Sequence, residues 1–147
     1  RHSLDVNLIA PFLLTQSLLS QLEKTNGTVL NISSIHARLT KKKFVAYATT
    51  KAALSGMTRA MAIDLGPRIR VNAIEPAAIE TQMLAASLSG QRNDYKKIKR
   101  CHPVNRIATP EEFARFVLRI ASNEFSFMHG SCIPFDGGIG SQINDHH

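Results

Sequence analysis

The sequence is poor in cysteine and contains no long apolar run. Its two cysteines, Cys101 and Cys132, form no C-x-x-C pair, which argues against a disulfide framework or a zinc site and favours a reducing compartment. No apolar stretch approaches the roughly 18 residues that a membrane-spanning helix needs, and the first residues lack the pattern of a signal peptide. We therefore expect a soluble, cytoplasmic protein with no membrane partner and no metal site.

Nucleic-acid-binding motifs are also missing, although the formal net charge is +7. The basic residues gather in two groups without interleaved aromatic side chains, namely Lys41 to Lys43, and Lys96, Lys97, Lys99 and Arg100. We interpret both groups as solvated surface and predict no nucleic-acid partner. With 147 residues, of which 44% are hydrophobic, the chain has the size and composition of one globular domain.

The first predicted element is a long helix with a proline in it. Residues 4 to about 22 show apolar side chains at the mixed three-and-four spacing of a buried helix. Pro11 should interrupt and kink this helix, because a proline has no N–H and leaves the carbonyl of Asn7 without its helical donor.

The remaining elements alternate between strand and helix. Strands are expected at 28–33, 69–74 and 130–136, a helix at about 44–64, a helical or mobile segment at 81–88, a polar stretch from there to residue 106, and a capped helix at 109–122. This order predicts an α/β fold with a parallel sheet. Pro134 confines the last strand to an edge of the sheet. The first strand has the composition of a central strand, so something else must cover its open edge.

The spacing of Tyr47 and Lys51 is the strongest chemical signal. Residues four apart on a helix share one face, and a nearby ammonium can lower the pKa of a phenol from about 10. A tyrosine then serves as a general acid and base. Ser34 follows the first strand and precedes this pair. Taken singly, each residue also has a structural explanation: a turn cap for Ser34, a core position for Tyr47, and solvation for Lys51.

Several motifs occur together, in a fixed order, across nearly the whole chain. They are Val6-Asn7, Asn31-Ile32-Ser33-Ser34, Tyr47-x-x-x-Lys51, Arg70-Val71-Asn72, the segment 76–81, and Asp136-Gly137-Gly138. In this combination the chain resembles the second half of a short-chain dehydrogenase/reductase. The resemblance implies a Rossmann-like, doubly wound parallel sheet, with residues 1–147 as the C-terminal part of a single domain.

The resemblance also implies an activity. It is the transfer of a hydride between NAD or NADP and a small-molecule alcohol or carbonyl substrate, in a homodimer or homotetramer. Tyr47 would exchange a proton with the substrate oxygen, Ser34 would hydrogen-bond that oxygen, and Lys51 would bind the nicotinamide ribose. Asn7 would complete the catalytic group by holding a relay water through its main-chain carbonyl. The implied cofactor contacts are Tyr47, Lys51, Pro76, Ile79 and Thr81.

Two residues depart from the family pattern in the loop that follows the second strand. Ala77 stands where the family usually has glycine, and Glu75 precedes Pro76. The residues that line the substrate pocket are expected within 35–38, 77–88 and 89–106, where the sequence does not identify the substrate.

A glycine-rich turn at the start of a helix, which normally holds the cofactor pyrophosphate, is absent from the sequence. Gly137, Gly138 and Gly140 lie near the C-terminus and open no helix. We therefore expect a fragment that is inactive alone. Two alternatives stay open. One is a non-catalytic binding or assembly module with the same fold, and the other is a 3-oxoacyl-carrier-protein-type reductase whose basic residues would contact an acidic carrier.

Overall fold

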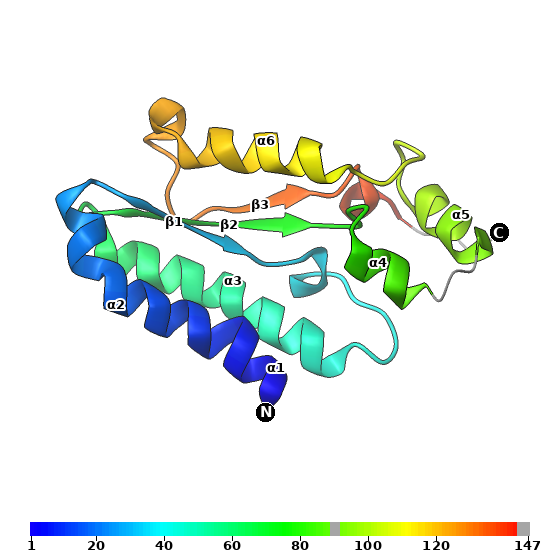
Figure 1. The fold of residues 1–147 in the computed structure, drawn as a ribbon, viewed down its shortest axis with the longest axis horizontal. Coiled ribbons are helices and arrows are strands. Elements are labelled where there is room, and N and C mark those ends of the chain that lie inside the picture. The colour runs from blue at the N-terminus through cyan, green and yellow to red at the C-terminus, as the bar shows by residue number, and fades with distance from the viewer. Residues whose placement is uncertain (89–91, 144–147) are drawn as a thin grey trace.

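A three-stranded parallel sheet forms the centre of the computed structural model, which describes residues 1–88 and 92–143 (Figure 1). The strands are β1 (Thr28–Ile32), β2 (Arg70–Pro76) and β3 (Cys132–Phe135), in the order β1-β2-β3. Thr28 pairs with Arg70 and Ala73 with Cys132 in the two ladders. The predicted α/β fold with a parallel sheet is confirmed.

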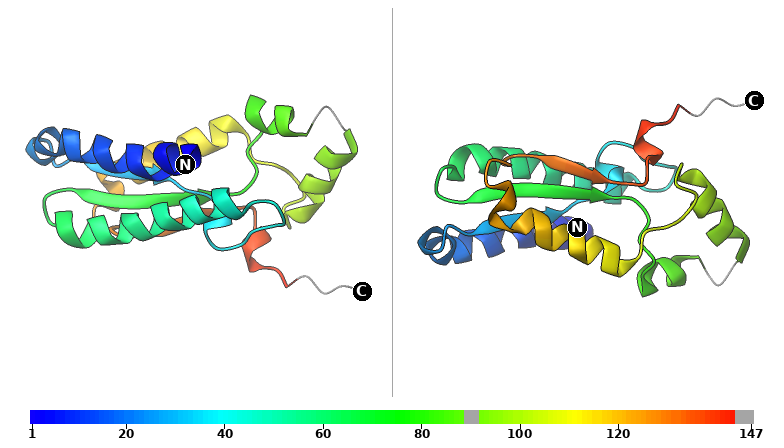
Figure 2. Two further views of the ribbon diagram at one scale, coloured as in Figure 1. Left: turned by 90° about the horizontal axis from the view of Figure 1, so that it is seen from below. Right: turned by 90° about the horizontal axis from the view of Figure 1, so that it is seen from above.

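Helices cover both faces of this sheet (Figures 1 and 2). One face carries α2 (Ala10–Lys24) and α3 (Val45–Leu65), and the other carries α6 (Pro110–Ala121). The core between α2, α3 and the sheet is made of buried or half-buried side chains from all three layers: Leu19, Leu22, Val29, Met57, Met61, Ala62, Leu65, Ile69 and Val71. Burial of this apolar surface is the main stabilising contribution on this face.

The second face is closed by aromatic packing and a capped helix. The rings of Phe113 and Phe116 on α6 lie 5.4 and 5.0 Å from the ring of Phe135 on β3. Thr109 and Glu112 form the predicted capping box, in which each side chain accepts a hydrogen bond from the other residue's backbone N–H. The predicted capping box is confirmed, and α6 ends within a residue of the predicted position.

The first helix differs from the prediction at Pro11. The chain stays helical through α1 (His2–Leu4), a π-helical segment η1 (Asp5–Ile9) and α2, so the helix is not interrupted. The backbone N–H of Ala10 donates to the carbonyl of Asp5, five residues back. A π-helical segment is a common way to absorb a local irregularity, and here it directly precedes the proline that lacks a donor.

Shorter elements connect these layers. They are the 3-10 turns η2 (Ile35–Ala37), η3 (Asn123–Phe125) and η4 (Ile139–Ser141), and the helices α4 (Gln82–Ser87) and α5 (Arg92–Cys101). The helix α4 lies in the segment expected to be helical or mobile, and α5, which was not predicted, lies in the stretch expected to be merely polar. Residue 89, the start of one predicted pocket stretch, lies outside the described residues. Within the described residues, no helix is long and apolar enough to cross a membrane.

The two edges of the sheet are unequal. Pro134 lies in β3, which pairs with β2 alone among residues 1–88 and 92–143, so its edge position agrees with the prediction. In the described part of the chain β1 also pairs with β2 alone, and its Ile32 is 40% exposed. The strand that was predicted to be central therefore has an open outer edge.

Candidate active site

The carboxyl end of β1 leads directly into Ser34. Ser34 is 5% exposed, and its side chain caps η2 by accepting a hydrogen bond from the backbone N–H of His36 at 3.2 Å. Ser33 N–H donates to the Ile74 carbonyl at 2.8 Å, which keeps this turn beside the end of β2. No acceptor for the Ser34 hydroxyl proton is found within residues 1–88 and 92–143, so this proton is available to a bound molecule.

Tyr47 and Lys51 lie on the first turns of α3, next to that turn. The Lys51 ammonium donates to the carbonyl of Ile32 at 2.8 Å, and its Nζ lies 5.9 Å from the centre of the Tyr47 ring. Burial lowers the pKa of Lys51, because a partly desolvated ammonium is disfavoured relative to the neutral amine. Tyr47 is 37% exposed, so its ring lies open to solvent on one side. The predicted tyrosine and lysine therefore meet at the end of β1.

The other side of the Tyr47 ring packs against two aromatic residues that the sequence did not single out for this site. The His36 ring lies edge-on to Tyr47 at 5.7 Å, and Phe44 lies edge-on at 6.0 Å. Burial, and then the charge of Lys41, lower the pKa of His36, which favours the neutral imidazole. Only the fold brings the His36 ring to the tyrosine.

Asn7 reaches the same helix turn through a buried threonine. Its Nδ2 donates to Thr50 Oγ1 at 3.1 Å, and Thr50 Oγ1 donates to the Tyr47 carbonyl at 2.8 Å. Thr50 is 1% exposed. The first helix is thus fastened to the turn that carries Tyr47. The role expected for the Asn7 main-chain carbonyl stays a prediction.

The predicted cofactor loop, residues 76–81, follows β2 at the same end of the sheet. Pro76 is buried at the end of β2, and Ile79 forms a parallel bridge with Ala108. Thr81 caps α4, where its Oγ1 accepts from the Leu84 N–H at 3.3 Å. The loop is therefore fixed to the segment that precedes α6.

A second contact holds this loop to α5. The Tyr95 hydroxyl donates to the Glu80 carboxylate, and this bond raises the pKa of Tyr95 to about 12. Lys99 Nζ lies 4.9 Å from the centre of the same ring. The loop and α5 are thus joined to each other near the carboxyl ends of the strands.

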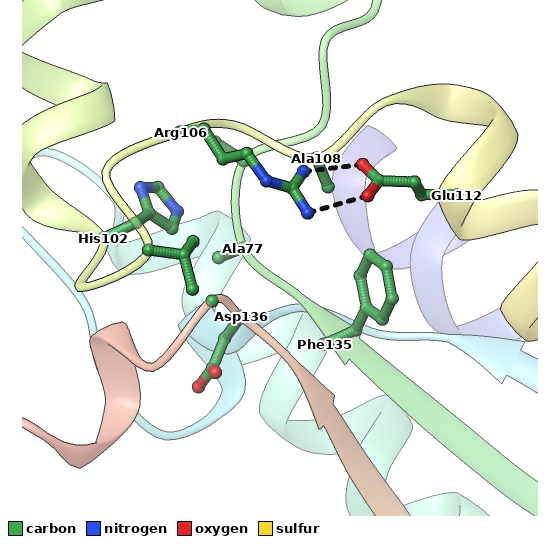
Figure 3. Close-up of a pocket in the computed structure, with 10 residues that line it drawn as sticks. Ala77, His102, Arg106, Ala108, Glu112, Phe135 and Asp136 are labelled. Carbon is green, nitrogen blue, oxygen red and sulfur yellow. Dashed lines mark hydrogen bonds and ion pairs between the residues drawn. The ribbon is translucent and has the colours of Figure 1, made fainter.

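A cavity of about 230 Å³ adjoins the start of the loop 76–81 (Figure 3). It is lined by Ala77, Ala78, His102, Val104, Arg106, Ala108, Glu112, Phe135, Asp136 and Gly137. His102 is 5% exposed, and its Nδ1 is 2.8 Å from the Ile98 carbonyl, while its Nε2 has no partner in the described residues. The Arg106 guanidinium makes two 2.7 Å hydrogen bonds to Glu112, which lower the pKa of that carboxyl to about 2.

The structure thus separates the predicted site residues into two neighbouring groups. Ser34, Tyr47, Lys51 and Asn7 gather around the end of β1, and none of them lines the cavity, which instead adjoins the loop after Pro76. Within the described residues, no group of three or more metal-ligating side chains is present. The arrangement around Tyr47 suits proton exchange with a bound oxygen, since a phenol, a free hydroxyl proton and a fixed ammonium lie at one edge.

Comparisons with known proteins agree with this arrangement. The family model described as enoyl-(acyl carrier protein) reductase matches residues 1–140. The 3-oxoacyl-[acyl-carrier-protein] reductase FabG of Aquifex aeolicus is 38% identical over 92% of this chain and 54% of that protein. The chain spans about half the length of the curated relatives it matches.

Solved structures show the same fold. The aldohexose dehydrogenase of Thermoplasma acidophilum, in ligand-free form, is similar with a TM-score of 0.93 and 29% identity, over 98% of this chain and 60% of that one. A 4-hydroxyisoleucine dehydrogenase complexed with NADH has a TM-score of 0.87 and 29% identity, over 95% of this chain and 58% of that one. Both are Rossmann-fold proteins like the one predicted here. The chain belongs to the short-chain dehydrogenase/reductase family of oxidoreductases.

Proposed function

We propose that the protein transfers a hydride between NAD or NADP and an alcohol or carbonyl substrate. The observation that carries this proposal is the meeting of Ser34, Tyr47 and Lys51 at the end of β1, with Lys51 fixed by the Ile32 carbonyl. The NADH bound to the similar 4-hydroxyisoleucine dehydrogenase supports a nicotinamide cofactor. No feature of these residues favours the phosphorylated or the unphosphorylated form.

The chemistry follows from the positions of the three side chains. During reduction the Tyr47 hydroxyl gives its proton to the substrate oxygen, and during oxidation it takes that proton back. The Ser34 hydroxyl donates a hydrogen bond to the same oxygen and stabilises the charge that develops there. The Lys51 ammonium stabilises the Tyr47 oxygen after its proton has left. Asn7 supports this turn through Thr50.

The residues at this edge fit the nicotinamide half of a dinucleotide. Pro76, Ile79 and Thr81 would contact the nicotinamide, beside Tyr47 and Lys51, and the loop that carries them is fixed by its bridge to Ala108. When bound, the cofactor supplies or accepts the hydride. A pyrophosphate cradle is not among these residues, because the sequence has no glycine-rich turn that opens a helix.

We therefore propose that residues 1–147 form the C-terminal part of a single dinucleotide-binding domain. Two observations support this: the chain spans about half of its relatives, and the outer edge of β1 has no strand beside it in the described residues. A strand of the remaining part would pair with β1 and bring the pyrophosphate site to the same edge.

Substitution of Tyr47 by phenylalanine in the full-length protein tests the reaction. Hydride transfer with NADH and NADPH would be followed by absorbance over a panel of small carbonyl compounds. We expect Tyr47→Phe to lose turnover by at least about 100-fold, because general acid catalysis contributes about that much or more. Thermal unfolding should not change, since the phenol oxygen makes no hydrogen bond within the described residues. Full turnover in this variant would overturn the assignment.

A second candidate substrate is an acyl group on an acidic carrier protein. The similarity to FabG favours it, and so do the basic residues of the loop before α3 and of α5, which lie at the end of the molecule where the strands terminate (Figure 1). Turnover of a carrier-bound acyl substrate should then fall steeply as salt is raised, while turnover of a small thioester should not. Equal salt dependence of the two substrates would exclude this candidate.

We also propose that the protein is a homodimer or homotetramer. Large apolar side chains are exposed on both helices of one face, including Leu13, Leu14 and Leu18 on α2 and Val45 and Ile63 on α3. Exposed apolar surface of this kind commonly marks a subunit interface. Sedimentation of the full-length protein measures its mass, and a monomer at micromolar concentration would contradict the proposal.

A further inference from the structure

A buried carboxylate joins the segments that carry the proposed catalytic residues. Glu75 is the residue before Pro76 in β2, and its side chain is 1% exposed. Its Oε2 accepts a hydrogen bond from Arg38 Nε at 2.6 Å, and its Oε1 accepts one from Ser55 Oγ at 2.9 Å. Isolated burial of a carboxylate is strongly unfavourable, so these two donors determine where the side chain and its neighbours lie.

Each donor belongs to a different part of the site. Arg38 ends the η2 turn that Ser34 begins, so the ion pair ties the Ser34 turn to β2. Ser55 lies on α3, one helical turn after Lys51. Its Oγ is 2.8 Å from Ser33 Oγ, which also lies 2.9 Å from the Lys51 carbonyl. Because Ser55 donates its proton to Glu75, the single Ser33 hydroxyl proton is shared between the Ser55 oxygen and the Lys51 carbonyl.

The fold alone gives little reason for a charge at this position. The neighbouring β2 residues Val71, Ala73 and Ile74 are fully buried and apolar. The Arg38 side chain is 45% exposed, so only the carboxylate of this pair is fully buried. Replacement of buried ionic groups by apolar side chains of similar volume is often neutral or stabilising. A charged pair at this point therefore suggests a role in geometry and not only in folding.

We propose that Glu75 and Arg38 are positioning residues for the reaction proposed above. Through this pair, and through Ser55 and Ser33, the end of β2 fixes the Ser34 turn relative to the α3 turn that carries Tyr47 and Lys51. The inference rests on the proposed function for its catalytic consequence, but the structural tie can be tested without turnover.

The kinetic experiment uses Glu75→Gln, Arg38→Gln and the double variant of the full-length protein. We expect each single variant to lower kcat by about tenfold or more, because displacement by about 1 Å can reduce a rate about 100-fold. KM for cofactor and substrate should change less than twofold. The double variant should be no slower than the slower single variant, since both remove one interaction.

Arg68→Gln is the matched control, because it removes another Arg–Glu pair, with Glu23, away from the proposed site. It should leave kcat unchanged. An unchanged kcat in Glu75→Gln, or losses in the two single variants that multiply in the double variant, would overturn the positioning role. Full activity of Tyr47→Phe in the same assay would instead overturn the proposed function.

Amide hydrogen exchange tests the tie independently of activity. In Glu75→Gln the backbone amides of Ala37 and Arg38 in the η2 turn should exchange at least about tenfold faster than in the unsubstituted protein, because the turn has lost its charged anchor. Arg68→Gln should leave these amides unchanged. Equal protection in Glu75→Gln and the unsubstituted protein would contradict the inference, whatever the turnover.

Discussion

The pH response of Lys51 gives a prediction at the scale of one residue. Burial lowers its pKa in the folded protein, so between this lowered pKa and the usual 10.5 the unfolded chain binds more protons than the folded one. The unfolding free energy should therefore rise with pH in this window. Catalysis should decline over the same window, because the ammonium that stabilises the Tyr47 oxygen is lost.

Lys51→Met is the control for that prediction. Denaturant unfolding at a series of pH values below 10.5 should show the difference between the unsubstituted protein and Lys51→Met moving in favour of lysine as the pH rises. In the unsubstituted protein, kcat should decrease as the pH rises through the same window. A difference in stability that is constant with pH would contradict the lowered pKa.

The sequence could indicate Ser34, Tyr47 and Lys51 because their signal is local spacing along a strand end and one helix face. It could not indicate the contacts that Glu75 makes with Arg38 and Ser55, since these residues are distant in the chain. Arg38 and Glu75, for example, are 37 residues apart. Such contacts exist only once the two strands lie side by side.

At the scale of elements, a hydrogen bond from Tyr95 to Glu80 joins α5 to the loop before α4, and a second bond, from Gln142 Nε2 to the Cys101 carbonyl, joins its last residue to the C-terminal segment. Tyr95→Phe removes the donor and leaves the ring, so α5 should open more often while the rest of the protein keeps its stability. The measurement is the rate of limited trypsin cleavage at the basic residues of α5. We expect faster cleavage in Tyr95→Phe than in the unsubstituted protein, and an equal rate would show that other contacts hold the helix.

The helix α5 also shows why hydrophobic periodicity in the sequence did not predict every helix. The residues of α5 are mostly charged or polar, so no apolar stripe marks them as a helix. Side-chain pairs such as Asp94 with Lys97 at 3.3 Å, and the contact of Tyr95 with the loop before α4, contribute to it instead. By contrast, α6 was predictable to within a residue because its capping box and apolar face agree.

At the scale of the whole molecule, alternation of helix and strand was enough to predict a parallel sheet. Only the edge position of the last strand was predictable, from Pro134, because the rest of the strand order depends on which crossovers the helices allow. The structure places β2 between β1 and β3, with α2 and α3 on one face and α6 on the other. The site residues therefore lie at the carboxyl ends of the strands, while the outer edge of β1 stays open.

This open edge predicts how residues 1–147 behave when they are produced alone. An uncovered edge strand pairs readily with other chains, and Ile32 on this edge is 40% exposed. Ile32→Lys should reduce self-association measured by sedimentation, because lysine on an edge strand disfavours pairing. Ile143→Lys, at an 88% exposed position outside the sheet, is the control and should have little effect. Equal self-association of the two variants would show that the apolar helix faces, and not the β1 edge, drive association. The β1 edge would then need no covering strand.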